Sequence, residues 1–410
     1  MKYSLAFLLC TCTLICFSQT RSLQGFIEQA KVRSPLLRGY QAQILQLRID
    51  SAILRATRKP QVAFVSNDLY APMIRGYGYD EAITNLAQVS GLVQVSRNFL
   101  QSGAIAAQFR SLQLQTQSLR DTIQLSIRDL TRTITDQYIT AYGDLLTLTY
   151  SKDLYDLLKS EEVALKKLAQ AAVIKQTEYL AFDITLQQQE LTYLQAQIQY
   201  TADYLALNYL AGIVDTTVST LAEPRFADSL PHDFYSSVFY RRYVTDSLRI
   251  QNERQLINYS YKPQLGAFAD GGYNSTLQNT PYKNLGFSVG VNLRIPIYDG
   301  HQKSLRYQRL DIDEQNRIRA RDFFVAQYRQ QFGALTRQLQ STEVLFDKIK
   351  RQVTYTKTLI EAYGKLLQTG DVKITDVITA ITNFLNAQNT FRQNVISRLR
   401  IQSQIAYFNQ

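Results

Sequence analysis

The sequence predicts a mainly α-helical protein with a small membrane β-barrel contribution, arranged as two tandem repeats. Three observations support this fold class. No proline occurs between residues 73 and 223 or after 296, which permits very long helices. Two segments, 88–96 and 287–295, alternate apolar and polar residues as strands do, and each follows a less regular strand-like segment. Similar motifs recur about 200 residues apart, so each half is expected to contain a short helix, a strand pair, a long helix, a turn and a second helix.

The N-terminal segment "MKYSLAFLLCTCTLICFSQT" has the pattern of a secretory signal peptide. Lys2 precedes an apolar run that is too short to remain as a membrane-spanning helix. We expect cleavage near residues 18–20, so that 1–19 is a signal peptide. All three cysteines lie in this segment, and the mature chain would have no disulfide or thiolate site. Bulky Leu14 and Ile15 before Cys16 disfavour lipid attachment.

The composition of the chain argues against several functional classes. The net charge is +11, but Lys and Arg are interleaved with acids, whereas a nucleic-acid surface would cluster them. The sequence has two histidines and no H-E-x-x-H, G-x-S-x-G or glycine-rich phosphate loop. A histidine triad and a histidine-rich metal site are therefore not expected. We predict no enzymatic activity and no cofactor, because a hydrolase that uses carboxylates alone has no supporting motif here.

The first repeat is expected to span 20–211. From Ser102 onward, apolar residues recur at intervals of three, four or seven, which predicts a helix over 102–168 with one packed face. At 1.5 Å per residue this helix would be about 100 Å long. A turn at 169–177 and a second helix at 178–211 complete a hairpin. So long a helix requires partners along its face.

A linker over 212–231 leads to the second repeat, 232–410. The pairs "RKPQVAF" with "YKPQLGAF" and "AVIKQTEYL" with "GDVKITDVI" relate the two halves. By this correspondence we expect a long helix at 300–366, a turn at 367–375 and a last helix at 376–408.

Strands are predicted at about 61–70, 87–99, 264–273 and 285–297. Their alternation fits a half-buried sheet of a soluble protein as well as strands that cross a membrane. Four strands cannot close a barrel, and open strand edges are not viable in lipid, so a membrane barrel would require several chains. One predicted face would meet lipid and carries Val93, Val95, Val289, Val291 and Leu293. The opposite face would line a lumen and carries Gln94, Ser96, Asn292 and Arg294.

Two motifs resemble the TolC family of outer-membrane efflux proteins. "GVNLRIPIYDGHQKSLRYQRLDIDEQ" is similar to that family's strand-to-helix junction, and it places Pro296, Asp299 and Gly300 there, with Gly103 in the first half. "LLQTGDVKITDVITAITNFLNAQ" is similar to the family's helical tip. The resemblance implies a homotrimer with a twelve-stranded barrel in the outer membrane of a Gram-negative bacterium and a helical tunnel in the periplasm.

The resemblance also implies a function and partners. The tunnel would passively conduct substrates outward, as the exit duct of a tripartite efflux or type I secretion-like system. A periplasmic adaptor and an inner-membrane pump would dock at the tip, and outer-membrane lipid would surround the barrel. The tip, gate and adaptor-contact residues are expected to be Ala172, Lys175, Thr177, Glu178, Gly370, Asp371, Lys373, Thr375, Asp376 and Val377.

Two alternatives remain open at the level of sequence. Three copies of Asp376 could form a ring of negative charge in the tunnel, joined by Asp371 and Glu178. The same acids could instead cap helix N-termini. Thr379 stands where family members often carry a further acid, and Ala172 and Glu178 depart from Gly370 and Asp376 of the second half. The alternative function is a soluble periplasmic coiled-coil adaptor or scaffold.

Overall fold

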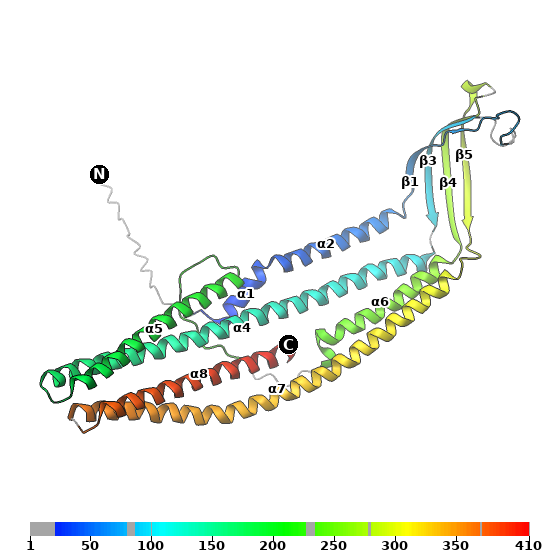
Figure 1. Cartoon of the computed structure of the whole chain (residues 1–410). Coiled ribbons are helices and arrows are strands. Elements are labelled where there is room, and N and C mark those ends of the chain that lie inside the picture. Colours follow the sequence, from blue (N-terminus) through cyan, green and yellow to red (C-terminus); the bar gives the residue numbers. More distant parts are fainter. Residues whose placement is uncertain are drawn as a thin grey trace, which may run out of the picture. The chain divides into compact units, whose positions relative to one another are not determined.

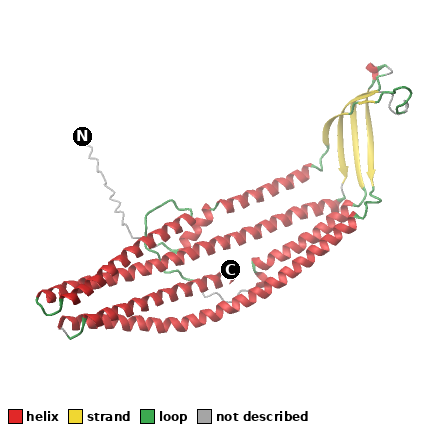
Figure 2. Cartoon of the chain, in the orientation of Figure 1, coloured by secondary structure: helices red, strands yellow, loops and turns green. Residues whose placement is uncertain are grey.

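The computed structural model describes residues 21–79, 87–99, 101–226, 234–277, 280–369 and 371–409. Most of its described residues lie in helices and few lie in strands (Figures 1 and 2), which confirms the predicted class of a mainly α protein with a small sheet. The expected signal peptide lies outside the described residues. None of the described helices is long and apolar enough to cross a bilayer.

The α-helices are α1 (Leu23–Arg33), α2 (Pro35–Ala56), α4 (Ser102–Gln170), α5 (Gln176–Leu210), α6 (Val238–Ser260), α7 (Gln302–Thr369) and α8 (Ile374–Asn409). The strands are β1 (Gln61–Ser66), β2 (Leu69–Tyr70), β3 (Ala87–Phe99), β4 (Gln264–Ser275) and β5 (Leu285–Arg294), with 3-10 turns η1 (Phe234–Ser236) and η2 (Pro281–Lys283).

The chain divides into two compact units, each built from parts of both repeats. Within the described residues, the hairpin unit comprises the stretches of 21–37, 125–237 and 326–409. The sheet unit comprises those of 38–124 and 238–325. The long helices α4 and α7 belong partly to each unit.

The helix at the start of the first repeat is broken into two at Ser34. Pro35 occupies the first helical position of α2, where its missing N–H costs nothing. The Ser34 side chain accepts a hydrogen bond from the N–H of Leu37 at 3.4 Å, as an N-cap does. The sequence analysis expected one short helix here, and the structure has α1 followed by α2.

The sheet joins the two repeats. β1, β3, β4 and β5 pair antiparallel in that order, so the pairing of β3 with β4 connects the first half to the second. β1 pairs with β3 from Gln61↔Ser96 to Ser66↔Gly91. β4 pairs with β5 from Gln264↔Arg294 to Tyr273↔Leu285.

The expected strand at about 61–70 is interrupted in the structure. β1 ends at Ser66 and β2 begins at Leu69, and both pair with β3. Ser90 of β3 explains the interruption. Its hydroxyl accepts from the N–H of Asn67 at 3.0 Å, and its own N–H donates to the Asp68 carboxylate at 3.2 Å. Hydrogen bonds that involve side chains therefore replace two backbone hydrogen bonds between the strands at this point, and the pairing with β3 resumes in β2.

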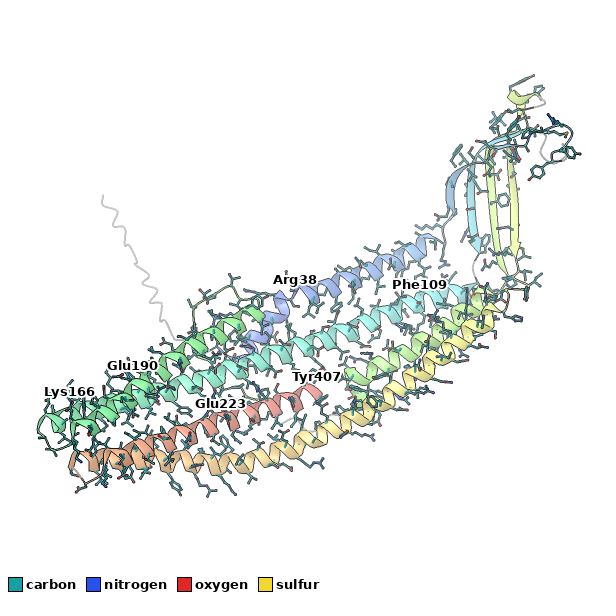
Figure 3. All side chains as sticks on the ribbon, in the orientation of Figure 1. Arg38, Phe109, Lys166, Glu190, Glu223 and Tyr407 are labelled. Atoms are coloured by element: carbon teal, nitrogen blue, oxygen red, sulfur yellow. The ribbon has the colours of Figure 1, made fainter. Side chains whose placement is uncertain are left out.

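The core of the hairpin unit lies between the two hairpins near their turns. Apolar side chains from α4, α5, α7 and α8 form one cluster, which contains Leu158, Phe182, Leu367 and Ile381. Figure 3 shows the side chains of this unit, including Lys166 near the end of α4 and Glu190 on α5, which accepts from the Tyr155 hydroxyl at 3.4 Å. A second cluster joins α1, α4 and α5 around Phe26, Tyr138 and Tyr204, each at most 2% exposed.

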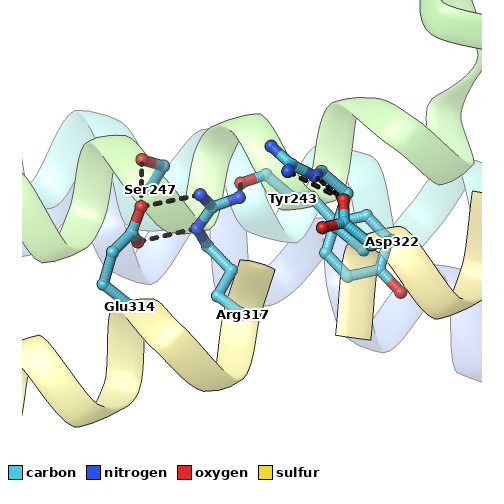
Figure 4. A network of polar contacts seen from close by, with 6 residues as sticks. Tyr243, Ser247, Glu314, Arg317 and Asp322 are labelled. Atoms are coloured by element: carbon cyan, nitrogen blue, oxygen red, sulfur yellow. Dashed lines mark hydrogen bonds and ion pairs between the residues drawn. The ribbon is translucent and has the colours of Figure 1, made fainter. Parts of the chain in front are cut away.

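Polar networks connect the helices of the sheet unit. Arg317 on α7 forms a two-point ion pair with Glu314, 2.7 Å at each nitrogen, and a third nitrogen donates to the Tyr243 carbonyl of α6 at 3.1 Å (Figure 4). Buried Asp121 on α4 accepts from Arg241 and Thr245 of α6 at 2.9 and 3.0 Å. Because a buried charge is costly unless it is paired, these contacts fix α6 against both long helices.

Candidate functional site: a two-faced sheet, its junctions and the helix turns

The sheet has one apolar face and one polar face. Paired residues of neighbouring antiparallel strands point to the same face, so Val95 shares a face with Val62, and Val289 shares it with Ala269 and Val93. The exposed apolar residues on this face include Val62, Phe64, Val93, Val95, Phe99, Leu265, Leu285, Phe287, Val289, Val291 and Leu293. All five residues that the sequence analysis assigned to lipid therefore lie on this one face.

The opposite face carries Gln94, Ser96, Asn292 and Arg294, the four residues that the sequence analysis assigned to a lumen. Asp270 and Ser288 lie on the same side, and the Ser288 hydroxyl donates to Asp270 at 2.8 Å. Most side chains on the apolar face are hydrocarbon, and Arg97, which pairs with Ala267 near the helical end of the sheet, is an exception. A contiguous exposed apolar face of this kind marks contact with a partner or with lipid.

Both edges of the sheet are open within the described chain. β1 pairs only with β3, and β5 pairs only with β4. Each edge therefore presents unpaired backbone N–H and C=O groups. In an apolar medium such groups must be satisfied by another strand.

The first strand-to-helix junction depends on Gly103, in the first turn of α4. A Cβ added at Gly103 would lie 2.1 Å from the hydroxyl oxygen of Tyr259 and 2.4 Å from its Cζ. Tyr259 is on the last turn of α6, so the glycine permits close contact between the two helices. Gly103 acts here as a packing residue, and the β3-to-α4 connection is completed by the Gln101 carbonyl, which accepts from the N–H of Ala104 at 3.0 Å.

The second junction is organised by Asp299. Its carboxylate accepts from the backbone N–H of Lys303 at 2.7 Å, which caps the start of α7. A hydrogen bond from the Tyr261 hydroxyl, followed by that from Lys303, lowers the pKa of Asp299. Gly300 has φ +65°, a left-handed conformation that favours glycine. Pro296 follows the end of β5 at Arg294, where no ladder N–H is required.

At the first helix turn, Ala172 adopts φ +57° and the N–H of Val173 donates to the Leu168 carbonyl at 2.9 Å. This is a Schellman-type ending of α4, with alanine where glycine is usual. Lys175 and Thr177 are exposed. The Glu178 carboxylate accepts from the N–H of Lys175 at 3.4 Å, so Glu178 lies in a capping position at the start of α5.

The second helix turn has the same type of backbone hydrogen bond as the first. The N–H of Asp371 donates to the Leu366 carbonyl, five residues earlier, at 3.0 Å. Gly370 lies outside the described residues. The Asp371 carboxylate accepts from the Thr369 hydroxyl at 2.6 Å. Lys373, Thr375 and Asp376 are exposed.

Val377 is only 4% exposed and packs in the hairpin core. Unlike its exposed neighbours, it holds α8 in place and presents no surface to a partner.

An apolar stripe runs along the outer side of α5. Its members recur at intervals of three, four or seven residues, which is coiled-coil spacing. We define the α5 stripe as Leu180, Ile184, Leu191, Leu194 and Ile198, each 45–71% exposed. Within the described chain this stripe is left uncovered, although the spacing is typical of a helix that packs against another helix.

The fold was compared with solved structures. The outer-membrane channel OprN matches with a TM-score of 0.74 at 13% identity, over 95% of this chain and 90% of that chain. The Campylobacter jejuni CmeC outer membrane channel matches with a TM-score of 0.72 at 12% identity, over 94% and 85%. The Vibrio cholerae outer membrane protein VceC matches with a TM-score of 0.72 at 13% identity, over 94% and 96%. The chain has the fold of these outer-membrane channels.

No family model matches the sequence, and no curated protein is similar to it in sequence. The outer-membrane channel fold applies to both repeats and the sheet, because the likeness extends over nearly the whole chain. Tyr259 and Tyr261, which hold the two junctions of this fold, were not identified from the sequence. The sequence feature that could have identified them is the segment "YSYKP", which places both tyrosines directly before the Lys-Pro pair that recurs in the two halves. Among the described residues, no group of three or more His, Cys, Asp or Glu is placed to hold a metal ion.

Proposed function

We propose that the chain is an outer-membrane channel-tunnel that passively conducts substrates from the periplasm to the exterior. The observation that carries this proposal is the four-stranded sheet with one apolar face, one polar face and two open edges, joined to long helical hairpins. A soluble sheet would expose its apolar face to water at a large cost. In a membrane the apolar face meets lipid and the polar face lines the channel.

The open edges support a homotrimer. Four long strands per chain give twelve in three copies, and closing them into a barrel pairs β1 of one copy with β5 of the next. The α5 stripe supports the same assembly in the helical part, since a neighbouring copy would cover it. The fold shared with outer-membrane channels is consistent with both features.

The helix turns would form the periplasmic end of this tunnel, where an adaptor and an inner-membrane pump dock. Exposed Lys175 and Lys373 offer cations to such a partner. Asp376 is exposed, and its carboxylate forms no ion pair with a described side chain. This leaves it available to form a ring of three carboxylates around the threefold axis. Glu178, in contrast, occupies a capping position.

Two experiments test the proposal. Extraction from membranes separates it from the soluble adaptor or scaffold, because release without detergent would exclude a barrel. In planar bilayers, the purified trimer should conduct ions with a preference for cations, and Asp376→Asn should reduce that preference. Unchanged selectivity in Asp376→Asn would remove Asp376 from the constriction while leaving the channel itself in place.

The facing of the sheet has its own matched pair of variants. Val291→Lys places a charge on the apolar face and should cost about 2–4 kcal/mol near mid-bilayer, which impairs insertion. Asn292→Lys places the same charge one residue later on the polar face and should insert normally. Equal insertion of both variants would show that the assigned facing is wrong.

A further inference from the structure

The hairpin unit contains a cavity of about 290 Å³ bounded by α4, α5 and α8, with polar and apolar side chains in its lining. Its lining includes one cation and no acidic side chain. Thr147 and Tyr150 on α4 lie in its wall, together with Asn389 and Arg392 on α8. The volume is sufficient for a small ligand and its first waters.

Three side chains around this cavity, those of Arg392, Asn389 and Tyr150, are available as hydrogen-bond donors, whereas the hydroxyls of Thr147 and Thr192 donate to backbone carbonyls of their own helices. The Asn389 side-chain oxygen accepts from Arg392 at 3.0 Å, which orients the guanidinium and leaves the Asn389 amide nitrogen to donate. Burial raises the pKa of Tyr150, so its hydroxyl keeps its proton and can donate too. Among the described residues, no carboxylate oxygen lies within ion-pair distance of Arg392. One guanidinium with convergent donors is the arrangement that binds oxyanions.

A pair of carboxyl groups lies one turn away from the cavity. Asp144 on α4 precedes Thr147 by three residues, and one of its oxygens is fully buried. It shares a hydrogen bond with Asp203 of α5, which also accepts from Gln137 at 2.9 Å. Two carboxyl groups in contact share one proton, because two adjacent negative charges repel each other.

The charged or titratable groups that face Asp144 are Asp203 on α5 and Arg392 on α8. Burial, followed by the contact with Asp203, raises the pKa of Asp144 from 3.8 to about 7. Burial opposes the shift of Asp203, but hydrogen bonds from Asp144, Gln137 and Gln199 lower its pKa. The shared proton therefore resides on Asp144. When it is lost, Asp144 carries a negative charge that interacts with the positive charge of Arg392.

We propose that this cavity is a binding site for a small oxyanion, held by Arg392 and admitted when Asp144 carries the proton it shares with Asp203. An ionised Asp144 competes for the charge of Arg392 and repels the ligand. A protonated Asp144 leaves the guanidinium to the oxyanion. The proposal does not depend on transport, so it stands or fails separately from the channel function.

Sulfate is the probe, because it remains a dianion between pH 6 and pH 8. The sequence contains no tryptophan, so Phe391→Trp introduces a unique fluorophore. Phe391 packs edge-on against Tyr150 of the cavity wall, with ring centroids 6.4 Å apart. The full chain in detergent is titrated with sulfate at constant ionic strength. We expect saturable binding that is roughly tenfold tighter at pH 6 than at pH 8, as a group with pKa near 7 requires.

Three variants in this background decide the outcome. Arg392→Gln should lose the sulfate response at both pH values. Arg392→Lys should weaken it, because an ammonium group cannot make the two parallel hydrogen bonds of a guanidinium. Asp144→Asn should bind at pH 8 as tightly as the parent does at pH 6. The matched control is Arg400→Gln, on the same helix but bonded to Thr140 outside the cavity, and it should behave as the parent.

Several results would overturn the proposal. Unchanged binding in Arg392→Gln would place the anion elsewhere, and the absence of a saturable response at pH 6 in the parent would remove the site. Equal affinity at the two pH values would remove the role of Asp144. Circular dichroism of each variant shows that the helices are intact, so a loss of binding is not a loss of folding.

Discussion

Replacement of Gly103 by alanine tests whether the first strand-to-helix junction depends on close helix packing. The added Cβ would meet three atoms of Tyr259, at 2.1 Å from the hydroxyl oxygen, 2.4 Å from Cζ and 2.8 Å from Cε1. These atoms belong to a rigid ring, so no single bond rotation at its end relieves all three overlaps, and either the ring or α6 must move. Overpacking of this kind typically costs about 1–3 kcal/mol. The helix propensity gained from alanine offsets less than about 1 kcal/mol. We therefore expect a net loss of roughly 1–2 kcal/mol in the free energy of unfolding.

The assay is guanidinium unfolding of the full chain in detergent, followed by circular dichroism at 222 nm. In a Tyr259→Ala background the additional effect of Gly103→Ala should vanish, because the overlapping ring is gone. The control is Gly39→Ala in α2, where a Cβ would meet no atom within 4 Å and should stabilise the helix by up to about 1 kcal/mol. Two results would refute the reasoning. Gly103→Ala could still destabilise the chain when Tyr259 is absent, or it could change the free energy of unfolding no more unfavourably than Gly39→Ala does.

Three further changes have expected outcomes. Ala172→Gly relieves a left-handed alanine at φ +57° and should raise the free energy of unfolding by about 1 kcal/mol, as measured by chemical denaturation. Asp299→Ala removes the α7 cap and the acceptor for Tyr261, and hydrogen exchange of the first α7 turn should become faster. The raised pKa of Asp144 means that the folded state binds its proton more tightly than the unfolded chain, so stability is lost as pH rises from about 4 through 7. Between pH 5 and pH 8 the raised pKa of Asp144 is worth at most about 3 kcal/mol, and its partial exposure reduces this, so Asp144→Asn should remove a pH-dependent stability difference of roughly 1–2 kcal/mol in melts at these two pH values. The lowered pKa of Asp203 changes stability only below about pH 4, outside this range.

The repeating features of the fold could be predicted because they depend on local periodicity. The alternation at 88–96 predicted β3, and the two faces of the sheet followed from the same alternation. The apolar intervals after Ser102 predicted α4, which ends within two residues of the expected position. Such patterns are set by the geometry of one helix or strand and require no knowledge of neighbours.

Contacts between distant segments could not be predicted from these patterns. Gly103 appeared to mark a helix start, but its role depends on Tyr259, which lies more than 150 residues away. Asp144 and Asp203 each look like ordinary surface acids within their own helices, and only the packing of α4 on α5 brings them together. The break after Ser66 depends on Ser90, whose side chain could have pointed anywhere in an isolated strand.

One short segment at the end of α6 contacts both strand-to-helix junctions. Tyr259 packs on Gly103 at the start of α4, and Tyr261, two residues later, donates to Asp299 at the start of α7. Lys303 adds a cation–π contact with Tyr261 at 5.3 Å. The end of α6 thus binds both long helices at the level where each leaves the sheet. A displacement of either helix would have to break a packing contact or a charged hydrogen bond there. If the proposed channel opens, we therefore expect this junction to stay in place. Cysteine pairs that crosslink Tyr259→Cys to Gly103→Cys should leave ion conduction unchanged. A closed channel after that crosslink would show that the junction itself moves.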